Sequence, residues 1–142
     1  MTPAMEPRFT PDLISELHES EIFVFGSNLA GHHGGGAAYA AFKRFGAEWG
    51  VGVGLTGHCY AIPTMQGGVD TIRPYVDEFI AFAAEHPELI FLVTPIGCGI
   101  AGFTPRQIAP LFAEAMELPN VVLPREFVLI LSRLTDKQYL TR

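Results

Sequence analysis

Short apolar runs punctuate the chain between polar and glycine-rich stretches. Residues 22–25 (IFVF) are β-branched or aromatic and too few for a helix, and residues 89–93 (LIFLV) form a continuous apolar run. Runs of this kind are typical of strands that are covered on both faces. Residues 58–62 and 120–123 give two further short runs, each followed by a proline. We predict a strand at each of these positions.

Apolar residues at three- and four-residue spacing predict helices between these strands. The clearest pattern begins at Thr71, a capping residue, and stops near His86. A second helix is expected over residues 35–45. Residues 125–134 fit either a strand or a helix, and the spacing of their apolar side chains favours the helix.

Two further helices are predicted where a threonine is followed by a proline. Thr10 is expected to cap a helix over residues 10–20. Its apolar face would consist of Leu13, Ile14 and Leu17. Thr104 is expected to cap another helix, because Gln107 stands three residues later, as in a capping box.

The alternation of strands and helices predicts an α/β fold. We expect a three-layer α/β/α arrangement with a mostly parallel sheet and helices on both faces. The 142 residues suit one domain over residues 1–142, with residues 1–9 and 135–142 loosely ordered. Ligand sites of such folds lie beyond the carboxyl ends of the strands.

Composition narrows the classes of function. Nearly half of the residues (49%) are hydrophobic and 17% are charged, as expected for a protein with a compact core. A net charge of −6 disfavours binding to a nucleic-acid backbone but leaves single nucleotides open. The two cysteines and the histidines lack metal-ligand spacing, so we expect neither a metal site nor a cofactor. The chain has no apolar run of membrane-spanning length, and we expect a cytoplasmic protein without membrane contact.

Two glycine-rich loops follow predicted strands. The first begins at Gly26 and contains Asn28, two histidines and a glycine triplet (residues 34–36), and the second spans residues 97–103 (GCGIAGF). Glycines let a backbone approach a ligand closely, and the first turn of a following helix offers unpaired NH groups to phosphate. The alternative is that these glycines only make tight turns. Because parallel strands end at the same edge of a sheet, we expect the two loops to lie side by side over one phosphate-containing ligand.

Several polar residues of these loops allow two interpretations. Asn28 suits either a turn or a ligand contact, and His32 or His33 either faces solvent or acts as a general acid or base. Cys98 is either a packed small residue or a nucleophile. Trp49, beside a stretch with alternating glycines (residues 50–57), either stacks on adenine or covers the surface.

At these two loops the sequence resembles the macro domain family, α/β modules that bind ADP-ribose. The resemblance spans residues 21–124 in the order of elements, and its specific part lies in the two loops. The sequence is also similar to short bacterial and phage-associated proteins of unknown role. The segments that carry the resemblance are Phe25 to Asn28, Gly34 to Ala37, His58 to Thr64 and Pro95 to Phe103.

This resemblance implies a ligand and a set of binding residues. The ligand would be ADP-ribose or a related NAD-derived nucleotide, either free or attached to an ADP-ribosylated macromolecule. Backbone NH groups of both loops would hold the diphosphate, Asn28 would bond the distal ribose, and Phe103 would pack on that ribose. The expected ligand-binding residues are Gly26, Ser27, Asn28, Gly34, Gly35, Gly36, Ala37, Gly97, Cys98, Gly99, Ile100, Ala101, Gly102 and Phe103.

Hydrolysis of an ADP-ribosyl linkage is a second hypothesis. Hydrolytic macro domains carry an acidic residue shortly after the glycine triplet, where this chain has Ala38, and the lysine of another branch has no counterpart in a loop. A hydrolase would therefore use Asn28, His32 and His33 as catalytic residues. A third hypothesis is a phage or host structural or interaction protein that oligomerises through an apolar surface at residues 127–131.

Overall fold

The computed structural model describes residues 8–140 of the chain, and the side chains of residues 8–134. Residues 1–7 and 141–142, where loose termini were expected, lie outside the described residues. The strands are β1 (Glu21–Ser27), β2 (Gly54–Thr56), β3 (Cys59–Pro63), β4 (Ile90–Val93) and β5 (Val121–Val122). The helices are α1 (Gly36–Arg44), α2 (Val69–Glu85), α3 (Pro105–Ile108), the 3-10 helix η1 (Ala109–Glu117) and α4 (Arg125–Leu140).

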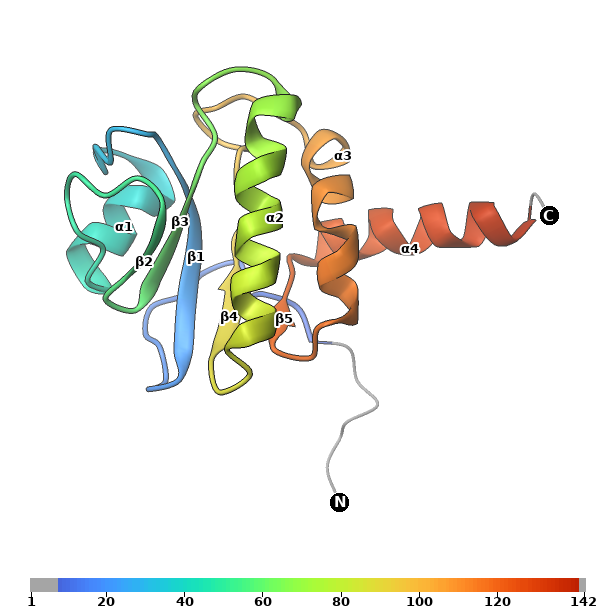
Figure 1. The fold of residues 1–142 in the computed structure, drawn as a ribbon, viewed down its shortest axis with the longest axis horizontal. Helices are drawn as coiled ribbons and strands as arrows, with labels where there is room; N and C mark the ends of the chain where they lie inside the picture. The colour runs from blue at the N-terminus through green and yellow to red at the C-terminus, as the bar shows by residue number, and fades with distance from the viewer. Residues whose placement is uncertain (1–7, 141–142) are drawn as a thin grey trace.

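The five strands form one mixed sheet in the order β2-β3-β1-β4-β5 (Figure 1). Only β2 runs antiparallel to its neighbour, and every other pairing is parallel. The prediction of an α/β fold with a mostly parallel sheet is therefore confirmed. In the described part of the chain, no helix combines the length and the apolar character needed to cross a membrane.

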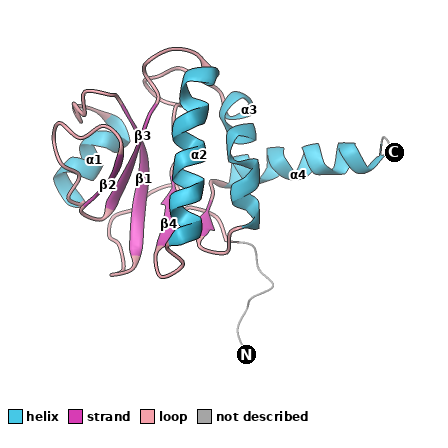
Figure 2. Ribbon diagram, in the orientation of Figure 1, coloured by secondary structure: helices cyan, strands magenta, loops and turns pink. Residues whose placement is uncertain are grey.

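Alternate side chains of β1 enter two separate hydrophobic cores. Ile22 and Val24 belong to a larger core with α2, η1 and the start of α4. Phe23 and Phe25 belong to a smaller core with α1. Among the described residues, the second face carries α1 together with irregular chain, and the three-layer arrangement stays a prediction (Figure 2).

Most predicted elements occur near their expected positions. The four predicted strands form, and β2 adds a short strand inside the glycine-rich residues 50–57. The capping box is present, with the Thr104 NH donating to Gln107 Oε1 at 2.9 Å. Residues 125–134 belong to a helix, as their spacing favoured. Helix α2 begins at Val69 rather than Thr71, and the Thr71 hydroxyl donates to the Gly68 carbonyl.

The predicted helix over residues 10–20 is wrong. This segment is irregular: Thr10 forms a parallel bridge with Pro124, and Ile14 and Leu17 then pack against the smaller core on the second face of the sheet. The Thr10 hydroxyl, expected to cap a helix, donates instead to the Val122 carbonyl at 3.0 Å. Of the expected apolar face, Leu13 is 82% exposed, whereas Ile14 and Leu17 are partly buried against the smaller core. These bonds of Thr10 to residues at and just after β5, together with the packing of Ile14 and Leu17 on the smaller core, outweigh the local helix signals, because tertiary contacts override weak propensities.

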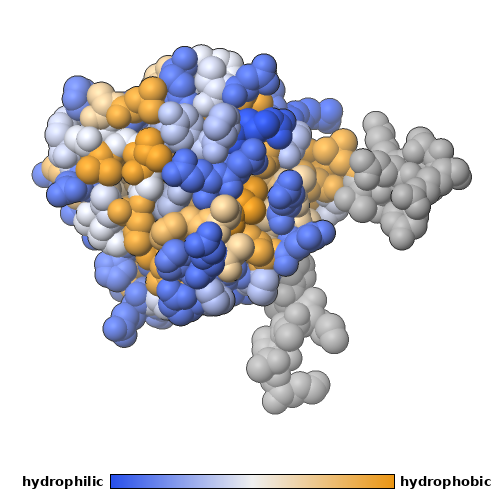
Figure 3. Space-filling model, viewed as in Figure 1, coloured by the Kyte–Doolittle hydropathy of each residue, from blue (hydrophilic) through white to orange (hydrophobic). Residues whose placement is uncertain are grey.

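Helix α4 packs its first two turns and then leaves the body of the protein (Figure 1). Phe127 and Leu131, in the segment considered for oligomerisation, are buried in the chain's own larger core. Leu129 and Leu134 are each 44% exposed, and apolar atoms show where α4 emerges (Figure 3). The apolar surface expected over residues 127–131 is therefore largely internal.

Candidate functional site

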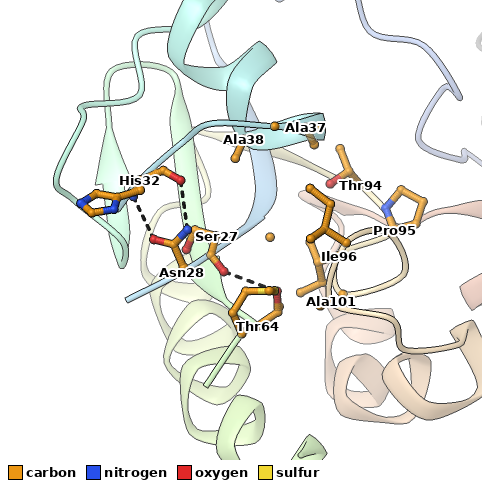
Figure 4. A pocket seen from close by; sticks show the side chains of 17 residues that line it. Ser27, Asn28, His32, Ala37, Ala38, Thr64, Thr94, Pro95, Ile96 and Ala101 are labelled. Carbon is orange, nitrogen blue, oxygen red and sulfur yellow. Dashed lines mark hydrogen bonds between the residues drawn. The ribbon is translucent and has the colours of Figure 1, made fainter. Parts of the chain in front are cut away.

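A cavity of about 270 Å³ lies at the carboxyl ends of β1, β3 and β4. Both glycine loops line it, although they are far apart in the sequence. Figure 4 shows Ala37 and Ala38 of α1 on one side, Thr64 on the other, and Ile96 between them. The lining residues are Gly26, Ser27, Asn28, His32, Gly35, Gly36, Ala37, Ala38, Thr64, Met65, Thr94, Pro95, Ile96, Gly97, Gly99, Ile100 and Ala101.

The first glycine loop is held in shape by Asn28. Its Oδ1 accepts from the His32 NH at 2.8 Å, and its Nδ2 donates to the His32 carbonyl at 3.0 Å. This pair of bonds closes the turn, as an asparagine side chain does in turns. The chain at Gly31 also lies directly against Gly50 and Val51, leaving no room for a side chain there. The first glycine loop therefore packs directly against the segment that contains Gly50 and Val51.

The second glycine loop is closed by its own backbone. The Phe103 NH donates to the Gly97 carbonyl at 2.8 Å, and Gly97 has a φ of 75°, which favours glycine. Ile100 stands at the tip and is 76% exposed. A Cβ built on Gly35 would lie 3.2 Å from Ile100 Cδ1, so the two loops approach each other across the cavity.

Hydroxyl groups lie at the ends of the three central strands. Ser27 ends β1 and donates to the Gly52 carbonyl. Thr64 follows β3 and donates to the Ser27 carbonyl at 3.4 Å. Thr94 follows β4 and donates to the Val24 carbonyl at 2.8 Å. The bonds of Thr64 and Thr94 tie the ends of β3 and β4 to β1, and the three hydroxyl-bearing residues form the floor of the cavity.

Backbone NH groups supply the donors of the site. In α1, Tyr39 is the first residue whose NH has an acceptor, the Gly35 carbonyl. Within the described residues, the NH groups of residues 35–38 have no acceptor, and neither do those of residues 97 and 99–101. The first turn of a helix carries partial positive charge, so this end of the cavity suits an anion.

The cavity itself carries no formal charge. Among the described residues, those that line it include no lysine, arginine, aspartate or glutamate. His32 is the one ionisable lining residue, and its ring stacks on Trp49 with centroids 5.6 Å apart. That ring points away from the space between Ser27, Thr64 and Ile96 (Figure 4). An anion here would depend on backbone donors rather than on a cationic side chain.

Five of the predicted site residues lie outside the cavity lining. His33 is fully buried behind the loop, where its Nε2 bonds to the Glu48 carbonyl at 3.0 Å and its ring edge meets Phe25. Phe103 packs against the larger core, beside Gly97, and its expected contact with a ribose stays a prediction. The remaining residues outside the lining are Gly34, Cys98 and Gly102.

Cys98 belongs to the second loop, and its side chain is half-buried. Its Sγ is 3.5 Å from the Ile96 carbonyl, and it packs against the larger core. Burial, with a smaller contribution from the Glu126 carboxylate, raises the pKa of the Cys98 thiol. A raised pKa keeps the thiol protonated, which disfavours the nucleophilic role considered for it.

The residues that follow β3 and β4 were not predicted as site residues. Thr64, Met65 and Thr94 line the cavity but were outside the predicted set, as were Pro95, Ile96 and Ala38. A usable signal exists, because the first residue after a parallel strand lies at the ligand edge of the sheet.

A second hollow, of about 410 Å³, lies beneath the irregular segment at the opposite end of β1. Leu92 and Val122 of the sheet form part of its lining, and Arg8, Glu16 and Glu21 border it. Neither glycine loop contributes to it. Among the described residues, no group of three or more metal-ligating side chains occurs at either hollow or elsewhere.

Comparison with known proteins gives no match: the chain matches no family model, no curated protein and no solved structure.

Proposed function

We propose that this protein binds ADP-ribose or a related NAD-derived nucleotide in the cavity between the two glycine loops, as the resemblance to macro domains implies. The observation that carries the proposal is that two remote glycine loops line one cavity, at the strand ends where α/β folds bind ligands. Backbone NH groups without acceptors and the first turn of α1 offer the donors that a diphosphate needs.

The size of the cavity suits part of such a nucleotide. Ligand pockets span about 300–1,000 Å³, and the cavity volume of about 270 Å³ lies just below that range. We therefore expect the diphosphate and one ribose to occupy the cavity and the adenine to lie over its rim. One ring face of Trp49 is already covered by His32, so adenine would compete with that stack.

Binding is supported better than hydrolysis. Neither histidine presents its ring to the cavity, and Asn28 uses both of its polar atoms to close the loop. The proposed activity is therefore recognition of the nucleotide, free or attached to a macromolecule. We also propose a cytoplasmic location, where its two free cysteines would remain reduced.

The test is a titration of Ala37→Asp. Ala37 is exposed at the second residue of α1 and lines the cavity. A carboxylate there favours the helix N-terminus but repels a diphosphate, so stability should be kept while ADP-ribose affinity falls at least tenfold. Calorimetry with ADP-ribose, AMP, ADP and NAD measures the affinity, and a thermal-shift series measures stability.

The matched control is Ala81→Asp, which adds the same charge at an exposed position of α2 outside the cavity. It should bind ADP-ribose like the unmodified protein. Wild-type protein that shows no heat and no thermal shift with any of the four nucleotides would contradict the proposal. So would an Ala37→Asp variant that binds ADP-ribose with unchanged affinity.

A further inference from the structure

The two threonines of the cavity floor each direct their hydroxyl hydrogen at a backbone carbonyl, at a short distance for Thr94 and a long one for Thr64. Thr94 Oγ1 donates to the Val24 carbonyl at 2.8 Å, and Thr64 Oγ1 donates to the Ser27 carbonyl at 3.4 Å. A carbonyl oxygen only accepts, so the hydroxyl must be the donor in both bonds. What each hydroxyl can still offer a bound molecule is its lone pairs.

These two acceptors come from the strands on either side of β1. Thr64 follows β3 and Thr94 follows β4, the two parallel neighbours of β1. Figure 4 shows Thr94 on the side of Ala37 and Ala38, and Thr64 on the opposite side of Ile96. Ser27, between them in the sheet, has also committed its hydroxyl hydrogen, to the Gly52 carbonyl. The floor is therefore a surface of hydrogen-bond acceptors.

The walls of the cavity thus offer hydrogen-bond donors, and its floor offers hydrogen-bond acceptors. The glycine loops offer NH donors, which phosphate oxygens accept. Oxygens of a phosphate gain nothing from the acceptor oxygens of Thr64 and Thr94, but sugar hydroxyl groups can donate to them. A molecule that satisfies both surfaces carries phosphate and hydroxyl groups together.

We propose that Thr94 and Thr64 accept hydrogen bonds from the hydroxyl groups of a ligand's ribose, and so select a phosphorylated sugar over a bare phosphate or diphosphate. This inference rests on the proposed function and narrows it, because it assigns the floor to the sugar. It also explains why a cavity without charged side chains can still be selective.

The test compares two ligands with the variants Thr94→Val and Thr64→Val. ADP-ribose carries sugar hydroxyl groups as donors, whereas inorganic diphosphate carries no sugar. Each valine variant should weaken ADP-ribose binding about tenfold, as expected for one lost hydrogen bond, and leave diphosphate binding within about twofold. NMR titration measures both dissociation constants on the full chain.

The variants are expected to fold, because the affected carbonyls keep a backbone partner. The Val24 carbonyl also accepts from the Thr94 NH at 3.0 Å, and the Ser27 carbonyl from the Thr64 NH at 2.9 Å. Thr94→Ser retains the hydroxyl and should restore ADP-ribose affinity. Thr10→Val is the matched control, since it removes a buried threonine bond to the Val122 carbonyl outside the cavity.

The outcomes separate this inference from the proposed function. If wild-type protein binds ADP-ribose and both valine variants bind it equally well, the threonines do not contact the sugar and the inference is wrong. A loss of both ligands in equal measure would also overturn it, because the hydroxyls would then only shape the loops. Wild-type protein that binds neither ligand would overturn the proposed function, and this inference with it.

Discussion

At the scale of single residues, Asn28 illustrates how one amide can set the shape of a binding loop. Its side chain bonds to both the NH and the carbonyl of His32, which leaves one N–H and the unused lone pairs for any other partner. Of the two interpretations of Asn28, the turn is the one that the contacts display. A contact with ribose through the remaining N–H stays a prediction.

Asn28→Ala should lower both stability and ADP-ribose affinity. Removing the amide leaves the His32 backbone groups without these partners, at a cost of about 1–2 kcal/mol in the free energy of unfolding. The freed loop must then be ordered on binding, which weakens the ligand. Urea denaturation and calorimetry with ADP-ribose measure the two effects.

The control for Asn28 is Asn120→Ala. Asn120 is buried far from the cavity, and its Nδ2 lies within 3.0–3.1 Å of the carbonyls of Ala83, His86 and Leu89. Its loss should destabilise the fold by at least as much and leave the affinity for ADP-ribose of the folded protein unchanged. If Asn28→Ala binds poorly but unfolds like wild type, Asn28 acts as a ligand contact and not as a loop clamp.

At the scale of elements, the sequence predicts best those segments whose burial is strictly periodic. Helix α2 buries Ile72, Val76 and Phe79 at three- and four-residue steps, so its pattern survives in the structure. Residues 10–20 carry cap signals but bury little, and Thr10 at their start forms a bridge with Pro124, just after β5. Pairing between chain segments so distant in sequence leaves no local trace, which is why this helix was predicted wrongly.

The candidate site shows the same division. Its glycine loops were predictable because glycine marks close backbone approach, and the carboxyl ends of parallel strands bring such loops together. Its floor was not predicted, because Thr64 and Thr94 look like ordinary loop residues until the register beside β1 is known. The full burial of His33 was not predicted, because a sequence does not reveal which loop side chains turn inward.

Gly52→Ala should be strongly destabilising because two loops meet there without room for a side chain. A Cβ on Gly52 would lie 2.1 Å from the Asn28 carbonyl oxygen and 2.7 Å from that of Leu29. Backbone atoms cannot yield as a flexible side chain can, so we expect a loss of about 2–4 kcal/mol. Urea denaturation measures the loss.

Gly99→Ala is the matched substitution at a glycine in the other loop. A Cβ at Gly99 meets no atom within 4 Å. The free energy of unfolding of the Gly99→Ala variant should therefore stay within about 0.5 kcal/mol of wild type. Equal stabilities for the two alanine variants would show that the loop containing Gly52 does not support the first glycine loop as described.

At the scale of the whole molecule, each core contains one ionisable side chain contributed by β3. Cys59 faces the smaller core and Tyr60 the larger one. Burial is the main cause that raises the pKa of the Cys59 thiol to about 12, from a usual 9.0. Burial, with a smaller contribution from the Glu78 carboxylate, raises the pKa of the Tyr60 hydroxyl to about 12, from a usual 10.0. Both cores therefore exclude an anion.

Alkaline pH should consequently destabilise the fold through both cores. The two groups lose their protons near pH 9.0 and 10.0 in the unfolded chain but only near pH 12 in the folded one. Between these values the folded state binds more protons than the unfolded state, so the free energy of unfolding falls as pH rises. Their stabilising contribution is complete below pH 9 and is lost progressively towards pH 12.

Tyr60→Phe isolates one of these contributions, because phenylalanine fills the same space without an ionisable group. Urea denaturation of wild type and variant at pH 8, 10 and 11 should give a stability difference that shifts in favour of the variant above pH 10. Other groups that titrate in this range affect both proteins alike and cancel in the difference. A difference that stays constant from pH 8 to pH 11 would mean that Tyr60 ionises as easily in the fold as outside it. The larger core would then be more open to water than the packing of the Tyr60 ring against Phe79 and Phe82 implies.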